Sequence, residues 1–419
     1  MILDKLFFVI TLIIIFTTSA EPNQVNCKDS LKPYNGEKSK FIVLLTKEQS
    51  EEHMKWMGEC FNFRSILKSY YSDSNDTSVA LDFSIEGTKL SGYVAWLYPR
   101  FVTEQLKTSV GVTNVQADLA NVTLTASTIT FKNPVPNLDR IDEATFPLDH
   151  KFTIPSTAGK GVNIYIIDSG INLDHVDFEG RASCGASFCS APGCEDCLDR
   201  NGHGSHVAGI AGGKKFGVAK KSNLIAVKVC ERRECNTGFS TSNTIAAMVY
   251  VFLRHQADNK KRTVINMSLG GPLNPIENFI VQILTSVGIH VVVAAGNDAH
   301  DADLDSPASA PEAITVGNIE SIDFDRLANS TNFGPRIDIF APGVNITSAS
   351  HLSNDGTAVL TGTSQASPHV AGAVALIISC KGNLSPADMA QRIIDLSTKD
   401  VIQGDLRNSP NRVLRVPRK

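Results

Sequence analysis

Three short motifs carry polar side chains that could act together in nucleophilic catalysis. "IIDSGI" places Asp168 at the end of an aliphatic run, "NGHGSH" places His203 between two glycines, and "GTSQASP" places Ser364 before a long apolar stretch. A serine hydroxyl becomes a nucleophile when a base removes its proton, and a histidine can be that base near neutral pH. A carboxylate can hold the imidazole and stabilise its cation.

Each motif alone also fits an ordinary structural role. Asp168 can cap a helix, and so can Ser364, since Pro368 suits a first helical turn. His203 and His206 are three residues apart and could share a helix face as a metal pair. No acidic "HE" motif accompanies them, so a zinc site has little support. The motifs therefore gain meaning only together and in a suitable fold.

Alternating strands and helices must position these motifs. Beyond about residue 160, near-continuous apolar runs predict buried strands, and the segments between them have helical spacing. This order predicts an α/β domain with a parallel sheet, in which ligands bind at the carboxyl ends of the strands. The expected strands are 162–168, 223–229, 263–269, 290–296, 313–319 and 337–343, and the expected helices are 204–213, 240–257, 277–288 and one from about Ser367.

A smaller α+β unit is expected before this domain. Its predicted element order, β-α-β-β-α-β, is ferredoxin-like. A loop-rich segment with several prolines then leads into the larger domain. The expected strands of the small unit are 41–45, 79–85, 92–97 and 112–118, and its expected helices are 47–70 and 100–109.

The first residues predict export. Leu6 to Phe16 form an apolar run that follows Lys5 and ends in small residues, which is typical of a signal peptide over 1–20. The run is too short for a good membrane span, although an N-terminal anchor is the alternative. We expect a product of the secretory pathway, extracellular or in a vacuole-like compartment, without a stable membrane span. The net charge of −4, with no basic block, argues against nucleic acid as a partner.

The chain has nine cysteines, which suits a protein that passes through the oxidising secretory pathway. Four of them lie in one insert, where disulfides are favoured in a secreted chain and a C-x2-C element leaves zinc as the alternative. Cys230 and Cys235 could bridge a short loop. Sequons suggest a glycoprotein, although Asn266 lies in a predicted strand and is expected to be buried and unmodified. The insert cysteines are Cys184, Cys189, Cys194 and Cys197, and the sequons are at Asn75, Asn121, Asn266, Asn329, Asn345 and Asn383.

Together the motifs resemble the subtilisin-like serine proteases, and "GVAKKSNLIAVKV" and "FEGRA" resemble their proteinase K-like branch. "IIDSGI", "NGHGSHVAG", "AAGND" and "GTSQASPHVAG" occur in the order Asp, His, Ser that is known for this family. The resemblance implies a three-layer, subtilisin-like peptidase domain over 129–419. The preceding segment resembles, more weakly, the family's inhibitor-type propeptide, over 21–128.

The resemblance also implies roles for individual residues. Ser364 would be the nucleophile, His203 the general base and Asp168 the group that orients it. Asn297 and the backbone N–H of Ser364 would stabilise the oxyanion. The walls of the specificity pocket carry no acidic group that could bind Lys or Arg, so a broad preference for apolar or aromatic residues before the cut is expected. The implied substrate contacts are Ser268, Leu269, Gly270, Ala294, Ala295, Gly296 and Phe239.

No cofactor is expected to be required, but the resemblance suggests a calcium site. Its ligands would be the carboxylate of Asp338 and the carbonyls of Pro311 and Ala313, which suit a hard cation. A purely structural Asp338 is the alternative. The chain departs from the family pattern at Gln365, where Met is usual, and at Ser205, where Thr is usual. Neither departure is expected to touch a proton-transfer group.

These observations predict a monomeric, secreted serine endopeptidase made as a zymogen. Its own propeptide would inhibit it until self-cleavage near 121–131, and its partners would be protein and peptide substrates. One alternative is a catalytically silent subtilase that binds a partner, although no triad residue is lost. Another is a proprotein-processing protease that binds basic residues through carboxylates in 231–234 or 194–199. A third is an unrelated hydrolase or a metal-binding structural protein that uses the cysteine insert.

Overall fold

The chain divides into two compact units, Met1–Thr123 and Leu124–Lys419. A computed structural model describes residues 39–46, 79–84, 90–97, 112–117, 127–189, 195–230, 239–321 and 323–418.

The N-terminal unit holds one antiparallel sheet in the order β2-β3-β1-β4. All four predicted strands are confirmed. The predicted helices over 47–70 and 100–109 lie outside the described residues. The strands are β1 (Ser39–Thr46), β2 (Val79–Ser84), β3 (Leu90–Leu97) and β4 (Val112–Ala117).

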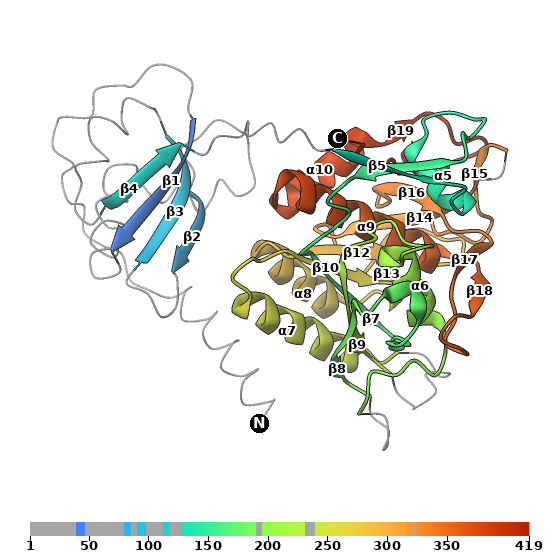
Figure 1. Ribbon diagram of the computed structural model, residues 1–419, viewed down its shortest axis with the longest axis horizontal. Helices are drawn as coiled ribbons and strands as arrows, with labels where there is room; N and C mark the ends of the chain where they lie inside the picture. The colour runs from blue at the N-terminus through green and yellow to red at the C-terminus, as the bar shows by residue number, and fades with distance from the viewer. Residues whose placement is uncertain are drawn as a thin grey trace. The chain divides into compact units, whose positions relative to one another are not determined.

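The C-terminal unit is built on a ten-stranded sheet (Figure 1). Its inner strands are parallel, in the order β20-β16-β14-β12-β10-β7-β9-β8, while β19 and β15 pair antiparallel. The predicted parallel sheet is confirmed. The strands are β7 (Asn163–Asp168), β8 (Ala182–Ser187), β9 (Asn223–Lys228), β10 (Thr263–Met267), β12 (His290–Ala294), β14 (Ile314–Ser321), β15 (Asp325–Leu327), β16 (Ile339–Pro342), β19 (Thr398–Lys399) and β20 (Arg412–Val413).

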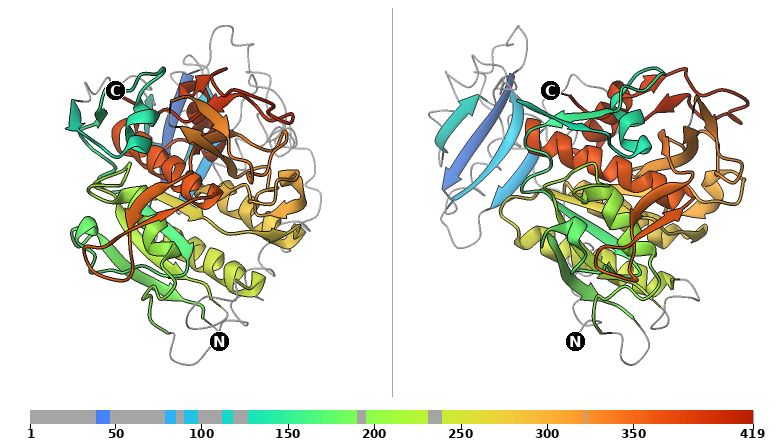
Figure 2. Two further views of the ribbon diagram at one scale, coloured as in Figure 1. Left: turned by 90° about the vertical axis from the view of Figure 1, so that its right-hand side faces the viewer. Right: turned by 45° about the vertical axis from the view of Figure 1, so that its right-hand side comes forward.

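Helices cover both faces of this sheet, which makes three layers (Figure 2). Along β7, Ile164 and Ile166 pack into a cluster with residues of α6 and α9, while Tyr165 and Ile167 pack into a second cluster with α7 and α8. Because successive strand residues face opposite sides, both sides must be apolar, and this explains the near-continuous apolar runs. The helices are α5 (Pro136–Asp142), α6 (His203–Gly212), α7 (Thr241–Ala257), α8 (Pro275–Ser286), α9 (Thr363–Lys381) and α10 (Pro386–Leu396).

Two local predictions differ from the structure. The helix expected from about Ser367 begins at Thr363, so Ser364 lies inside its first turn. The segment expected to be loop contains a short helix, α5, between two paired strands. Proline at the first position of α5 explains the difference, because its missing N–H is not needed there. The smaller elements are β5 (Thr128–Lys132), β6 (Lys151–Pro155), β11 (Gly271–Pro272), β13 (Asp305–Ser306), β17 (Ile346–Ala349), β18 (Thr357–Leu360), and the 3-10 turns Val176–Phe178 and Ala302–Leu304.

The cysteine insert is crosslinked. Cys184 and Cys197 form a disulfide with a Cα–Cα distance of 5.4 Å, so zinc binding by these two residues is wrong. Cys189 and Cys230 are also disulfide-bonded, whereas Cys380 is free and buried. Cys194 and Cys235 lie outside the described residues. Among the described helices none alone is long and apolar enough to cross a membrane, and only α9 with α10, bent by 105°, reaches the required length as a pair.

Candidate active site

Asp168 and His203 meet at the carboxyl edge of the sheet. Asp168 is the last residue of β7 and is fully buried, while His203 is the first residue of α6. The Nδ1 atom of His203 lies 2.8 Å and 3.0 Å from the two carboxylate oxygens of Asp168. Burial lowers the pKa of His203, but the charge and hydrogen bond of Asp168, together with the charge of Asp199, outweigh it, so the pKa is raised.

The glycines on either side of His203 allow this close approach. A Cβ on Gly204 would lie 2.1 Å from the carbonyl oxygen of Gly170 and 3.1 Å from a carboxylate oxygen of Asp168. Gly202 has φ +103°, and a Cβ there would lie 2.4 Å from the ring of His351. A larger residue at position 204 would therefore collide with the backbone beside Asp168, and one at position 202 would collide with His351.

Asp199 holds the turn that carries His203, and sequence reasoning missed it. Its buried carboxylate accepts hydrogen bonds from the hydroxyls of Ser169 and Ser205 at 2.9 and 2.6 Å, and from the N–H groups of Gly202 and Ser205 at 2.8 Å each. The only sequence signal was an Asp four residues before the candidate base. Ser205 keeps this hydroxyl bond although Thr is usual at its position in the family that the motifs resemble.

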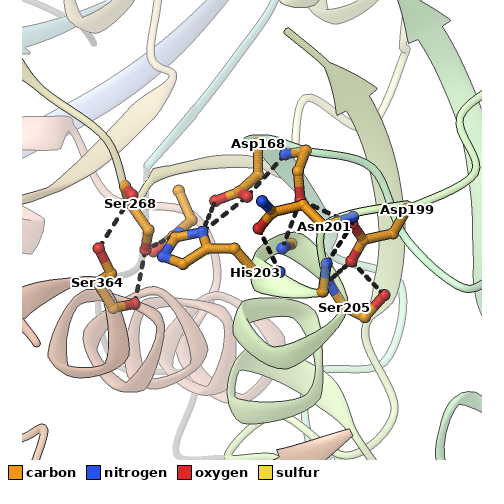
Figure 3. A network of polar contacts seen from close by, with 11 residues as sticks. Asp168, Asp199, Asn201, His203, Ser205, Ser268 and Ser364 are labelled. Carbon is orange, nitrogen blue, oxygen red and sulfur yellow. Dashed lines mark hydrogen bonds and ion pairs between the residues drawn. The ribbon is translucent and has the colours of Figure 1, made fainter. Parts of the chain in front are cut away.

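Ser364 lies in the first turn of α9, and the imidazole of His203 lies between it and Asp168 (Figure 3). Its hydroxyl donates to the carbonyl of Ser268 at 3.1 Å. Its own carbonyl has no helical donor, because the residue four positions on is Pro368, which lacks an N–H. The hydroxyl of Ser268 donates to that carbonyl instead, at 2.8 Å.

The side chain of Asn297 has a fixed orientation. Its Oδ1 accepts from the backbone N–H of Thr363 at 2.9 Å and from the Thr363 hydroxyl at 3.2 Å. A backbone N–H can only donate, so the carbonyl end of the amide must face Thr363 and the Nδ2 end must face away. Nδ2 has no hydrogen-bond partner among the described residues. Asn297 and the N–H of Ser364, in the first helical turn, are thus two free donors beside the hydroxyl.

A cavity of about 270 Å³ opens beside Ser364. It brings together most of the predicted substrate-binding residues. The expectation that no carboxylate lies there is wrong, because Asp298 and Asp305 also line the cavity. Ser268 is not among the lining residues but makes two hydrogen bonds with Ser364, which is. The predicted residues that line the cavity are Leu269, Gly270, Ala294, Ala295, Gly296 and Asn297.

Phe239 is not among the residues that line this cavity. It lies just before α7, half-buried against the core cluster of α7 and α8. Its predicted contact with substrate stays a prediction.

The histidines near the site do not form a metal pair. His206 is buried, and its Nε2 lies 3.0 Å and 3.2 Å from the carbonyls of Ile346 and Ala358. Burial lowers its pKa to about 4, so it is a neutral core histidine. His203 uses its Nδ1 for Asp168. The alternative of a zinc site on this helix face is therefore wrong.

The predicted calcium ligands lie just before two paired strands: Pro311 and Ala313 precede β14, and Asp338 precedes β16. The carboxylate of Asp338 accepts from the N–H of Thr315 at 2.8 Å, and burial raises its pKa to about 6. Thr315 is two residues beyond Ala313 and four beyond Pro311. A carboxylate that is poorly solvated and lies beside this segment fits a hard cation, which would stabilise its charged form. Calcium at Asp338, Pro311 and Ala313 stays a prediction.

Residues 159–411 match the model of the subtilase family. The chain belongs to the subtilase family. This subtilase is 42% identical over 281 residues, 67% of its length, to an extracellular serine proteinase of Thermus sp. (strain Rt41A). It is 34% identical over 382 residues, 89% of either chain, to a cuticle-degrading serine protease of Arthrobotrys oligospora.

The subtilase is also similar to a solved structure. A cold-adapted subtilisin-like serine proteinase superposes with a TM-score of 0.63 and 35% identity, over 68% of this chain and 99% of the other. The predicted family and the three-layer α/β fold are therefore confirmed. The chain spans 65% of the length of the Thermus proteinase.

Proposed function

We propose that this chain is a serine endopeptidase with Asp168, His203 and Ser364 as its catalytic triad. The observation that carries the proposal is the Asp168–His203 pair, at 2.8 Å, with Ser364 on the other side of the imidazole. Relatives that are named as serine proteinases support it. A silent, partner-binding subtilase is disfavoured because each group that the chemistry needs is present.

The geometry supports a two-step acyl transfer. The Ser364 hydroxyl turns from the Ser268 carbonyl to His203 Nε2, and its oxygen attacks the carbonyl carbon of the substrate while the imidazole takes the proton. Asp168 stabilises the imidazolium, which then protonates the leaving amine as the C–N bond breaks. Water, activated by the same histidine, hydrolyses the acyl-enzyme. The Asn297 amide and the Ser364 N–H stabilise the negative oxygen in both steps.

The zymogen part of the proposal concerns the N-terminal unit. Residues 1–20 would be the signal peptide and residues 21–128 the inhibitory propeptide, with the peptidase domain over 129–419. Support comes from the compact N-terminal unit and from the similarity to the Arthrobotrys protease across 89% of both chains. Self-cleavage near 121–131 would release a monomeric extracellular enzyme. Calcium, when bound at Asp338, would stabilise the fold and take no part in the reaction.

Expression of residues 21–419 beside a Ser364→Ala variant tests both parts. If the wild type loses roughly 100 residues over time, by chain mass, and the variant stays intact, the chain processes itself through Ser364. Equal processing of both would assign maturation to another protease, and a peptide assay of the processed forms then decides the activity. If another protease has processed the wild type and the processed form cuts no peptide, the proposal is overturned in favour of a binding protein.

A further inference from the structure

The cavity beside Ser364 is placed to receive the substrate side chain that precedes the cut. Ser364 and Asn297 are among the residues that line it, and these residues would hold the attacked carbonyl. The side chain on the adjacent Cα must then enter the same cavity. The charge of its lining therefore determines which residue is accepted, provided that the proposed peptidase activity holds.

Asp305 is a fixed carboxylate in this cavity. It lies on β13, which pairs with β11, so its backbone is held in a small sheet. Its Oδ2 atom accepts from His300 Nε2 and from Asn332 Nδ2, each at 2.7 Å. A Cβ on Gly296 would lie 2.9 Å from Oδ2, so the carboxylate is packed against the cavity wall. The side chain is 14% exposed.

The second oxygen of Asp305 is left for a ligand. Both hydrogen bonds use Oδ2, and Oδ1 has no partner among the described residues. An ionised carboxylate can accept several hydrogen bonds, so a donor from the substrate would be accommodated.

Asp298 adds a second negative charge. It directly follows Asn297 and is exposed, and its N–H is held by Asn332 Oδ1 at 2.9 Å. Each of Asp298, His300 and Asp305 has one polar side-chain atom in a group of three whose members lie within 4.8 Å of one another. No Lys or Arg of the described chain lines the cavity. A cation is thus the complementary ligand for this pocket.

The apolar residues of the lining suit the methylene stem of a long basic side chain. Leu269, Ala294 and Ala308 are buried and apolar, and they line the cavity together with the two carboxylates. Lys and Arg bury their methylene stems against such surfaces and present the charged end to an acceptor. We propose that this pocket selects Lys or Arg before the cut, with Asp305 as the specificity-determining residue and Asp298 as a supporting charge.

Matched peptide substrates that differ only at this residue test the proposal, with Met as the uncharged counterpart of Lys. We expect the full, self-processed enzyme to have a higher kcat/KM for Lys than for Met. Asp305→Asn keeps the shape and a carbonyl acceptor but removes the charge. It should lower the Lys-to-Met ratio about 10- to 100-fold, the range expected for one hydrogen bond to a charged group. A ratio that Asp305→Asn leaves within twofold of wild type would overturn the proposal.

Asp298→Asn is the second variant, should Asp305→Asn fail to fold. Its charge is solvent-exposed and screened, so we expect a fall of about two- to fivefold in the same ratio. An unchanged ratio in Asp298→Asn, with Lys no better than Met in the wild type, would count against an acidic pocket.

A binding measurement separates this inference from the proposed activity. Calorimetry on the Ser364→Ala chain, freed of residues 21–128 by the wild-type enzyme or by an added protease, needs no turnover. Benzamidine, a small planar cation, should bind and its neutral analogue benzamide should not, and Asp305→Asn should abolish the difference. If benzamidine binds in this way but no peptide is cut, the acidic pocket stands and the peptidase proposal fails. Equal binding of the two probes refutes the acidic pocket, whatever the activity.

Discussion

The hydroxyl of Ser268 donates to the backbone carbonyl of Ser364 at 2.8 Å, and the hydroxyl of Ser364 donates back to the carbonyl of Ser268 at 3.1 Å. The first bond exists because Pro368 has no N–H to offer that carbonyl. Behind it, Asn266 donates to the Ser268 hydroxyl at 3.0 Å and accepts from Ser367 at 2.6 Å. The end of β10 thereby fixes the first turn of α9. Asn266 is fully buried here, as expected, so its sequon is not an accessible acceptor.

Ser268→Ala should lower the free energy of unfolding by about 1–3 kcal/mol, because the carbonyl of Ser364 loses its donor. Pro368→Ala supplies a helical N–H for that same carbonyl, so the loss should be clearly smaller in the Pro368→Ala background. Urea unfolding in the inactive Ser364→Ala background measures both without self-digestion. Equal losses in the two backgrounds would show that the Ser268 bond is not a substitute for the helical one.

Asn297→Ala should reduce kcat about 10²- to 10³-fold with little change in KM, which is the loss measured for an oxyanion donor in subtilisin itself. The reason is that Nδ2 meets the substrate oxygen only when charge develops on it. Asn297→Asp is the matched control: it keeps an acceptor for Thr363 but lacks the donor. If Asn297→Asp retained wild-type kcat, the amide would matter only for holding Thr363.

Asp199→Asn should shift the acid limb of the kcat/KM profile to lower pH. The negative charge of Asp199 helps to raise the pKa of His203, so its removal lowers that pKa and leaves the imidazole neutral, and able to act as a base, in more acidic solution. The profile is measured with one peptide between pH 4 and pH 9. Ser205→Ala removes a hydroxyl that donates to Asp199 at 2.6 Å but keeps the charge, and it should lower stability without this shift. An identical shift in both variants would assign the effect to loop geometry.

The strands could be predicted from the sequence, whereas the acidic lining of the pocket could not. Buried strands need apolar residues on both faces, and this leaves a readable pattern. Asp305 has no such pattern around it, because it is one of several acidic residues after Asn297. Asp301 caps a 3-10 turn, Asp303 pairs with Arg336 on the surface, and only the path of the chain turns Asp305 into the cavity.

The same limit applies to contacts between distant segments. Ser268 and Ser364 are 96 residues apart, and Asp199 and Ser169 are 30 apart. Such pairs depend on which strands become neighbours in the sheet, and no local pattern encodes that order. Family resemblance predicted the triad, but it led to the expectation of a pocket without carboxylates, which Asp298 and Asp305 contradict.

Gln365→Met should raise the free energy of unfolding by about 1–3 kcal/mol. Gln365 is 2% exposed, and its Nε2 has no hydrogen-bond partner among the described residues. Replacing this amide with a thioether of similar length removes an unsatisfied buried donor. Urea unfolding in the Ser364→Ala background measures the gain, and Gln365→Ala, which also removes the amide but leaves a cavity, should gain less. A lower stability of Gln365→Met than of wild type would mean that the amide is satisfied after all.

Because the new sulfur adjoins the nucleophile, active Gln365→Met should also lose activity in peroxide faster than wild type.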